Sequence, residues 1–385
     1  MYCRGRAGGN TSFGDGKMIY FDNAATSFYK SKEMAESVYS YILNSGNPSR
    51  GAHEASLNAS RIVLNARVKC AEFFDCSDFN KVVFTSGVTE SLNIVINGLI
   101  EKNDHVITSV YEHNSVLRPL YRTGCELSIT NGTAENIRKE IKENTKAVII
   151  THVSNVTGDI TDISSIGRLC REKGILFIVD SAQSAGVLPI SMKKSFIDIL
   201  CFTGHKGLGG IQGSGGLCIE GDIDIKPFKV GGSGIHSYDK NHPSEYPTRL
   251  EAGTMNVPGI LSILKGIENI SQKGIENIYK KEKALSDCCK KRLSEFENIK
   301  IYENTKNNIG IVSFTVNNID SAYISDMLSF KFDICTRAGA HCAPLIHEFF
   351  NEESMVRASF AAENTFEEID IFINALNEIL EDKND

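Results

Sequence analysis

The sequence predicts an α/β protein with a mostly parallel, doubly wound sheet in a large domain and a smaller α+β domain. Three observations predict this class. Short apolar runs rich in β-branched residues recur through the middle of the chain, helical patterns lie between several of them, and a charge-rich helical stretch precedes a C-terminal part. With 385 residues, the chain is long enough for two hydrophobic cores.

The apolar runs are expected to be buried strands, because short β-branched segments fit strands that are covered on both faces. These runs are 81–86, 104–109, 126–130, 146–154, 175–180, 198–203 and 216–220. Helices are expected at 31–44, 52–75, 91–100 and 162–173. In such a sheet, ligands bind at the carboxyl ends of the strands, which is where the polar residues of interest fall.

After Pro258, a helical stretch rich in Lys and Glu is expected to continue to about Phe296. Short strands then alternate with helices over 309–316, 321–330 and 366–381. The predicted domains are therefore 31–262 (large) and 18–30 with 263–385 (small). Residues 1–17 are Gly-rich and polar without the apolar centre of a signal peptide, and we expect a flexible extension there.

Composition excludes several classes of function. The net charge of −7 argues against nucleic acid or an anionic membrane as a partner, and no apolar run approaches the roughly 20 residues that span a bilayer. The eleven cysteines show no paired spacing and no Cys/His cluster typical of zinc, so no metal site is expected. A reducing cytoplasm is the simplest location.

Lys206 follows an expected strand, with Thr203 and His205 just before it and glycines after it. A lysine at such a place is most often a solvated surface residue. Here the flanking hydrogen-bonding side chains and the glycines, which allow a ligand close to the backbone, suit a lysine that forms a Schiff base with a phosphate-bearing aldehyde.

Asp180 ends another expected strand, and Gln183 follows three residues later. One interpretation is a helix N-cap with Gln at the capping-box position. The alternative is that a buried Asp180 pairs with a protonated pyridine nitrogen and keeps that ring electron-withdrawing. The proximity of Asp180 and Lys206 at neighbouring strand ends favours the second interpretation.

Three further strand ends carry candidate residues. Thr89 lies at the expected start of a helix in the segment SGVTES, where backbone N–H groups and a hydroxyl could bind a phosphate. His113 follows the next strand, either as a capping or surface histidine or as a ring stacked on a cofactor. Asn155 comes just past a third strand in THVSNVTG.

The ordered motifs T-E, E-H-N, H-V-S-N-V-T-G, V-D-S-A-Q-S, T-G-H-K and E-A-G-T resemble those of class V aminotransferases of fold type I. Within these, the sequence is most similar to the cysteine desulfurase and selenocysteine lyase group. The resemblance runs from about Ile19 to the C-terminus. It implies that pyridoxal 5'-phosphate is the cofactor.

The resemblance also implies a role for each motif residue. Lys206 would carry the cofactor, Asp180 would contact the pyridine nitrogen, Gln183 the ring oxygen, and His113 would stack on the ring and assist proton transfer. The phosphate would be held by Thr89, Thr203 and His205. Val88 would also lie at the cofactor, at a position where a threonine often occurs in the family. Asn155 would lie beside the ring and the substrate. Thr254 resembles a threonine given to the neighbouring subunit's phosphate, which implies a homodimer with shared active sites.

Cys342 stands apart from the other cysteines, in a Gly/Ala-rich loop after Arg337 and His341. It could be a small loop filler, but cationic groups beside an exposed thiol favour the reactive thiolate. The loop resembles the R-x-G-x-H-C-A loop of Suf-type desulfurases, although CAPLIH replaces their usual C-A-Q-P-L.

Arg357, in an R-A-S motif, resembles the arginine that binds the substrate carboxylate. Asn155 and Arg337 are further candidates for substrate contact. His53 and Arg50, in the segment NPSRGAH, are expected to line the entrance.

The resemblance implies a cysteine desulfurase, which converts L-cysteine to L-alanine and transfers the sulfur to Cys342 as a persulfide. A protein or thiol acceptor would follow, and iron–sulfur cluster assembly is one of several destinations. Selenocysteine lyase and cysteine-sulfinate desulfinase are alternatives that depend less on Cys342. A non-catalytic nucleotide-binding or scaffold protein would instead need a GxGxxG turn, which SGVTES lacks.

Overall fold

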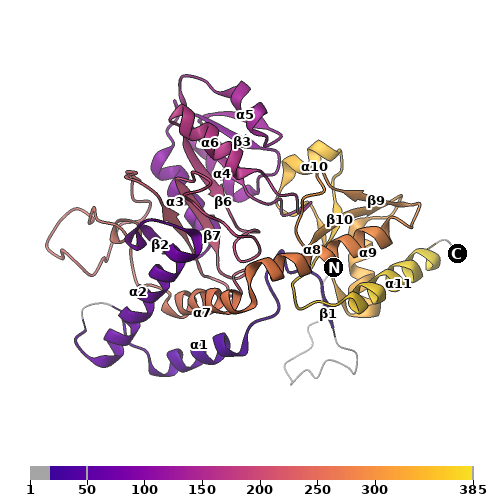
Figure 1. Ribbon diagram of the computed structural model, residues 1–385, viewed down its shortest axis with the longest axis horizontal. Coiled ribbons are helices and arrows are strands. Elements are labelled where there is room, and N and C mark those ends of the chain that lie inside the picture. The colour runs from indigo at the N-terminus through magenta and orange to yellow at the C-terminus, as the bar shows by residue number, and fades with distance from the viewer. Residues whose placement is uncertain (1–17, 49–50, 384–385) are drawn as a thin grey trace.

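The computed structural model describes residues 18–48 and 51–383. The predicted N-terminal extension, residues 1–17, and Arg50 lie outside these described residues. Figure 1 shows a larger unit built around a central sheet and a smaller unit made mostly of the C-terminal elements, drawn in orange and yellow.

The large sheet has the topology that the sequence predicts. In the described part of the chain, its seven strands run in the order β2-β8-β7-β6-β5-β3-β4. Pairings are parallel, except that β8 is antiparallel to both of its neighbours. The strands are β2 (Val82–Thr85), β3 (His105–Ser109), β4 (Glu126–Thr130), β5 (Thr145–Thr151), β6 (Leu176–Asp180), β7 (Ile199–Thr203) and β8 (Gly215–Ile219). The mostly parallel, doubly wound sheet is therefore confirmed.

Helices cover both faces of this sheet, because the strand side chains alternate between two apolar cores. In β6, for example, Phe177 and Val179 enter one core and Ile178 enters the other. The first core is shared with α1 (Lys32–Asn44), α2 (Glu54–Phe74), α5 (Ala134–Glu140), α6 (Ile163–Lys173) and α7 (Val257–Lys273). The second core is shared with α3 (Val88–Leu99) and α4 (Asn114–Thr123).

Side-chain caps fix where most of the helices begin. Ser31, for instance, accepts a hydrogen bond from Met34 N (3.1 Å) at the start of α1. The start of α3 differs, because its N-cap residue is Gly87, which has a φ of +152° and no side chain to cap the helix. The first N–H groups of α3 are therefore left open to a ligand.

The second unit is built around a smaller antiparallel sheet, with β12-β13-β10-β9 as the order of its four strands among the described residues. Its C-terminal elements are α8 (Ile275–Leu293), β9 (Ile299–Tyr302), β10 (Ile311–Val316), α9 (Ser321–Phe332), β11 (Ile334–Cys335), β12 (Arg337–Gly339), α10 (Pro344–Phe350), β13 (Met355–Ser359) and α11 (Phe366–Asp382). The short strand β1 (Ile19–Tyr20) pairs in parallel with β11, and Phe21 packs in the core of this unit. The predicted α+β character is confirmed.

Gly274 interrupts the long helix that the sequence predicts between Pro258 and Phe296. The stretch forms α7 and α8, because Gly274 takes a φ of +79° between them. α7 packs on α1 and α2, whereas α8 contributes to the core of the second unit. The predicted continuous helix is wrong, and the predicted limit between residues 262 and 263 falls inside α7. The domain limits themselves stay a prediction.

No helix among the described residues is long and apolar enough to cross a lipid bilayer. Within the same residues, no group of three or more His, Cys, Asp or Glu side chains could hold a metal ion.

α7 passes very close to the loop that follows Lys206. A Cβ atom at Gly266 would lie 1.9 Å from the carbonyl oxygen of Leu208. Gly209 N in turn donates a hydrogen bond to Lys206 O (2.8 Å), so this contact bears on the loop that carries the lysine.

We expect Gly266→Ala to lower the free energy of unfolding by about 1–3 kcal/mol, because either α7 or the Leu208 loop must move to make room. Urea unfolding would measure the change. Gln272→Ala, on an exposed part of the same helix, is the control and should have little effect. Equal stability of the two variants would show that the contact is not tight.

Candidate active site

The predicted site residues gather at one edge of the large sheet. β2, β3, β5, β6 and β7 point the same way and end at this edge. Asp180 is the last residue of β6, Thr89 lies in the first turn of α3 after β2, and the loops after β3, β5 and β7 carry His113, Asn155 and Lys206. The topology of the sheet therefore brings together residues that are far apart in the sequence.

Lys206 is at the centre of this group. Burial lowers the pKa of its amine to about 8, while Asp180 raises it and Arg357 and Arg337 lower it further. These side chains are thus all close enough to act on the lysine electrostatically. An amine with this pKa has a substantial neutral fraction at physiological pH, and the neutral form is the nucleophile.

Asp180 is 2% exposed, at the end of β6. Its Oδ1 accepts a hydrogen bond from Ala182 N (2.8 Å), and no helix follows, so the alternative of a helix N-cap is wrong. Burial is the main cause that raises the pKa of this carboxyl, and Lys206 partly opposes it. No donor among the described residues reaches Oδ2. A buried carboxylate in this state favours a cationic partner.

The N-terminus of α3 forms an anion-binding cradle. Gly87 and Gly215 approach so closely that a Cβ at Gly215 would lie 2.6 Å from Gly87 Cα. Val88 and Thr89 follow as the first residues of the helix, and Thr203, at the end of β7, is nearly buried beside Gly87. Open N–H groups and hydroxyls of this kind suit a phosphate.

His113 is linked to this cradle through Ser115. Thr89 Oγ1 lies 2.7 Å from Ser115 Oγ, which in turn lies 2.8 Å from His113 Nδ1. Ser115 N also donates to Nδ1 (3.0 Å), so His113 caps α4, as one interpretation of the sequence held. Burial lowers its pKa to about 4, and the neutral ring carries its proton on Nε2. Its stacking and proton-transfer roles stay predictions.

His205 and Gln183 connect the site to the N-terminal segment. His205 Nδ1 lies 3.1 Å from Thr26 Oγ1, and burial lowers the histidine pKa to about 4. Gln183 Nε2 donates to Ala24 O (3.0 Å), which leaves its other amide groups for a ligand. Lys30 donates to Gly210 O (2.6 Å) and so helps to fix the loop after Lys206.

Asn155 and Arg357, both predicted to contact the substrate, are hydrogen-bonded to each other. Arg357, in β13, has a side chain that is 3% exposed. Its Nη1 donates to Asn155 O (2.9 Å) and its Nη2 to Asp22 Oδ1 (2.9 Å). Its Nε is buried without a partner among the described residues. An unpaired buried donor costs about 1–3 kcal/mol, and a bound carboxylate would remove that cost.

The Cys342 loop belongs to the second unit but is held by the first. Asn114 N donates to Cys342 O (2.7 Å), and Asn155 Nδ2 donates to His341 O (2.8 Å). Cys342 itself is exposed. Because Asn114 directly follows His113, the thiol-bearing residue is fixed next to the Lys206 group. Asn114 was not among the residues predicted for the site, and its only signal in the sequence is its place directly after His113.

His341 does not supply positive charge to the thiol, contrary to the expectation from sequence. Burial lowers its pKa to about 3, and its ring stacks on His347 with a centroid distance of 5.9 Å and an interplanar angle of 17°. Arg337, which is exposed in β12, is the remaining nearby cation of the motif.

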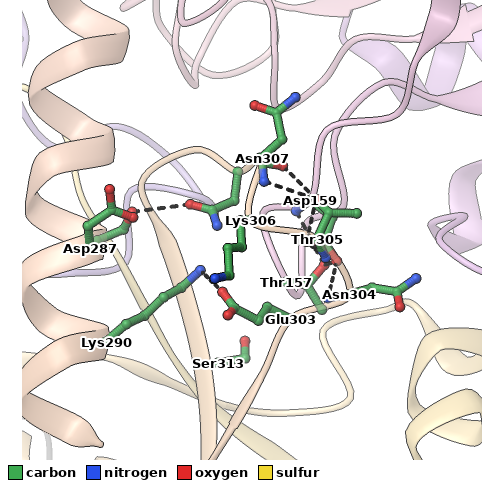
Figure 2. A network of polar contacts seen from close by, with 12 residues as sticks. Thr157, Asp159, Asp287, Lys290, Glu303, Asn304, Thr305, Lys306, Asn307 and Ser313 are labelled. Carbon is green, nitrogen blue, oxygen red and sulfur yellow. Dashed lines mark hydrogen bonds and ion pairs between the residues drawn. The ribbon is translucent and has the colours of Figure 1, made fainter.

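Asp159 anchors the hairpin that carries Asn155 (Figure 2). Its carboxylate accepts hydrogen bonds from Thr157 Oγ1 (2.7 Å), Asn304 N (3.0 Å) and Thr305 N (3.1 Å). Ile309 N also donates to Gly158 O (3.0 Å). Asp159 is 3% exposed, so these bonds form a joint between the two units that is built on a buried acceptor. Asn155 thereby keeps its place relative to β13 and the Cys342 loop.

Two of the predicted site residues, His53 and Thr254, form no hydrogen bond with the residues around Lys206 in the described part of this single chain. His53 is an exposed N-cap of α2, and its Nδ1 accepts from Ser56 N (3.3 Å). Thr254 is exposed on the loop before α7. Their predicted roles, at the entrance and in a neighbouring subunit, stay predictions.

Pyridoxal phosphate fits these residues. The neutral fraction of Lys206 suits its aldehyde, the buried Asp180 suits its pyridine nitrogen, and the open start of α3 suits its phosphate. The three groups lie at the ends of β7, β6 and β2, which matches a single ligand spread along this edge of the sheet.

The fold and the site together define a pyridoxal-phosphate-dependent enzyme. More specifically, the chain belongs to the aminotransferase class-V family, whose model matches residues 19–372. A probable cysteine desulfurase of Pyrococcus abyssi is 34% identical over 384 residues, with 94% of each chain covered.

Solved structures agree with this assignment. A cysteine desulfurase from Thermococcus onnurineus superposes with a TM-score of 0.89 at 33% identity, covering 94% of this chain and 95% of its own. A cysteine desulfurase from Escherichia coli has a TM-score of 0.86 at 24% identity and coverage of 94% and 95%, and it supports the fold alone.

We expect pyridoxal phosphate to attach to the cofactor-free protein faster as the pH rises from 6 through about 8, with the rate levelling off about one pH unit above that. The reason is that Lys206 reacts as the neutral amine, whose fraction grows as the pH approaches its pKa of about 8. The rise of cofactor absorbance with time would measure this rate. Lys206→Ala is the control and should show no covalent attachment; a rate independent of pH would contradict the lowered pKa.

We expect Asp159→Ala to lower the free energy of unfolding by about 2–4 kcal/mol, because three donors at the joint lose their buried acceptor. Urea unfolding would measure the loss. Asp287→Asn is a control from the same region: its carboxylate is 53% exposed and bonded to Lys283, so a change of about 0.5 kcal/mol or less is expected. If both variants lose the same amount, the Asp159 joint does not stabilise the fold.

Proposed function

We propose that this protein is a pyridoxal-phosphate-dependent cysteine desulfurase that stores the sulfur of L-cysteine on Cys342. One observation carries the proposal: an exposed thiol is tied by its own backbone oxygen to the residue after His113, at the edge of the Lys206 group. Membership of the class-V family and the similarity to named cysteine desulfurases support it.

When bound, the cofactor supplies an electron sink for a negative charge that develops on the substrate Cα. Asp180 favours the cationic form of the pyridine nitrogen, which strengthens that sink. Lys206 Nζ, once released by the substrate amine, accepts the Cα proton. Arg357 holds the substrate carboxylate through its remaining N–H groups, while the carbonyl of Asn155 accepts from its Nη1.

The Cys342 thiolate then attacks the substrate sulfur. A sulfur–sulfur bond forms, the Cβ–S bond breaks, and the electron pair of the broken bond stays with carbon. Carbon takes up a proton to become the methyl group of L-alanine, and Cys342 keeps the sulfur as a persulfide. The persulfide is reduced only when an acceptor thiol or another reductant takes the sulfur.

The proposal extends to the setting of the reaction. A sulfur-accepting protein or thiol receives the persulfide sulfur, with iron–sulfur cluster assembly as one destination. The enzyme works as a cytoplasmic homodimer in which Thr254 of one subunit contacts the phosphate of the other. The exposure of Thr254 and its place outside the Lys206 group support this arrangement.

We expect Cys342→Ala to lose at least about a hundredfold in sulfide and alanine release from L-cysteine with a thiol reductant, because the sulfur acceptor is removed. The cofactor absorbance should stay unchanged, since Cys342 does not hold the cofactor. Both products would be measured for the wild type, for Cys342→Ala and for Cys288→Ala, a partly buried thiol of α8 that serves as control.

If Cys342→Ala releases sulfide as fast as the wild type, Cys342 is not the sulfur acceptor. The same variants tested on L-selenocysteine and L-cysteine sulfinate would then decide whether the enzyme is a lyase or a desulfinase, since those substrates need no thiol acceptor.

A further inference from the structure

The carboxylate of Asp22 is the one strong contact of Arg357 that the proposed reaction does not use. Asp22 Oδ1 accepts a hydrogen bond from Arg357 Nη2 (2.9 Å). Asp22 lies in the loop after β1 and Arg357 lies in β13, so the two residues are far apart in the sequence. An acidic side chain thus already lies on the guanidinium that is proposed to bind the substrate carboxylate.

The backbone around Asp22 leaves the side chain little freedom. Ser359 N donates to Phe21 O (2.7 Å), and Asn23 N donates to Ser359 O (3.4 Å). The side chain of Ser359 also accepts from Ala24 N (2.9 Å). Asp22 is therefore held along β13, the strand that carries Arg357, and it is placed before any substrate arrives.

Arg357 has five N–H groups, and only some of them donate to an acceptor within the protein. One goes from Nη1 to Asn155 O and one from Nη2 to Asp22. Nε is buried without a partner among the described residues, and each Nη keeps a second N–H. Asn155 and Asp22 together fix the plane of the guanidinium, and the remaining donors lie in that plane.

We propose that Asp22 is a positioning residue that orients Arg357 for the substrate carboxylate and limits how tightly that carboxylate binds. The inference rests on the proposed function. Its hydrogen bond orients the guanidinium, and its negative charge offsets part of the positive charge of Arg357, Arg337 and Lys206. Asp22 also raises the pKa of Lys206, so its charge acts on the lysine as well as on Arg357.

The two effects of Asp22 can be separated by substitution. Asp22→Asn keeps an oxygen that can accept from Nη2 but removes the charge, so a carboxylate ligand should bind more tightly. Asp22→Ala removes the charge and the acceptor, so the guanidinium can turn and the same ligand should bind more weakly. Opposite effects of these two variants are the signature of a positioning role.

The probe is 3-mercaptopropionate, a thiol carboxylate without an amino group, which cannot displace Lys206 from the cofactor. Calorimetric titration of the cofactor-loaded protein would give its Kd. We expect Asp22→Asn to lower Kd by about three- to tenfold and Asp22→Ala to raise it by about tenfold. Asp326→Asn, an exposed charge change on α9, is the matched control and should leave Kd unchanged.

Arg357→Gln separates the failure of this inference from the failure of the proposed function. If Arg357→Gln binds the probe as well as the wild type does, the carboxylate is not bound at Arg357, and both proposals about this subsite are overturned. If Arg357→Gln abolishes binding while Asp22→Asn matches the wild type, or while both Asp22 variants shift Kd in the same direction, only the role of Asp22 is overturned. Thermal unfolding of each variant would exclude misfolding, and the near-isosteric Asp22→Asn keeps the test decisive if Asp22→Ala does not fold.

Discussion

Asn155 makes two hydrogen bonds on which the geometry of the whole site depends. Its side chain donates to His341 O, next to Cys342, and its carbonyl accepts from Arg357 Nη1. One residue of the large unit therefore sets the position of both the sulfur acceptor and the proposed carboxylate-binding group. The buried Asp159 joint fixes the hairpin that carries Asn155 (Figure 2). Two units with separate cores can thus hold reacting groups in one arrangement, as proximity catalysis requires.

Burial pushes the titratable groups of the site toward their neutral forms. It lowers the pKa of His113 to about 4 and raises that of Glu112 to about 8. Glu112 lies directly before His113; its Oε1 accepts from Thr151 N (2.9 Å), and its buried Oε2 has no partner among the described residues. The guanidinium groups of Arg357 and Arg337 keep their charge. The substrate side is therefore positive, which suits an amino acid that enters by its carboxylate.

The sequence predicted the strands and the edge of the sheet at which the candidate residues gather, because these signals are local. The roles of most of these residues were implied by the resemblance to the family and stay predictions. Asp180 and Lys206 each follow an apolar strand, and a parallel sheet brings strand ends together. It did not predict the break at Gly274, since a glycine within a helical pattern can also be tolerated. Nor could the sequence show that His341 is buried and neutral, because the burial of a loop histidine depends on tertiary contacts and not on its neighbours in the sequence. Asp22 and Asn114 were missed for the same reason: their roles arise from contacts with residues distant in the sequence.

The position of Asp22 also gives a reason for the packing of β1 and the segment after it on the second unit. β1 pairs with β11, and the segment after it runs along β13 before the chain enters the large unit. If this segment packed only on the large unit, Arg357 would be buried in β13 without a nearby counter-charge, which is strongly unfavourable. With the observed packing, Asp22 accepts a hydrogen bond from Arg357 Nη2 (2.9 Å), and Asp22 and Asp180 both raise the pKa of Lys206. The two carboxylates therefore have different partners in the proposed reaction: Asp180 serves the cofactor nitrogen, and Asp22 serves the guanidinium of Arg357 that receives the substrate carboxylate.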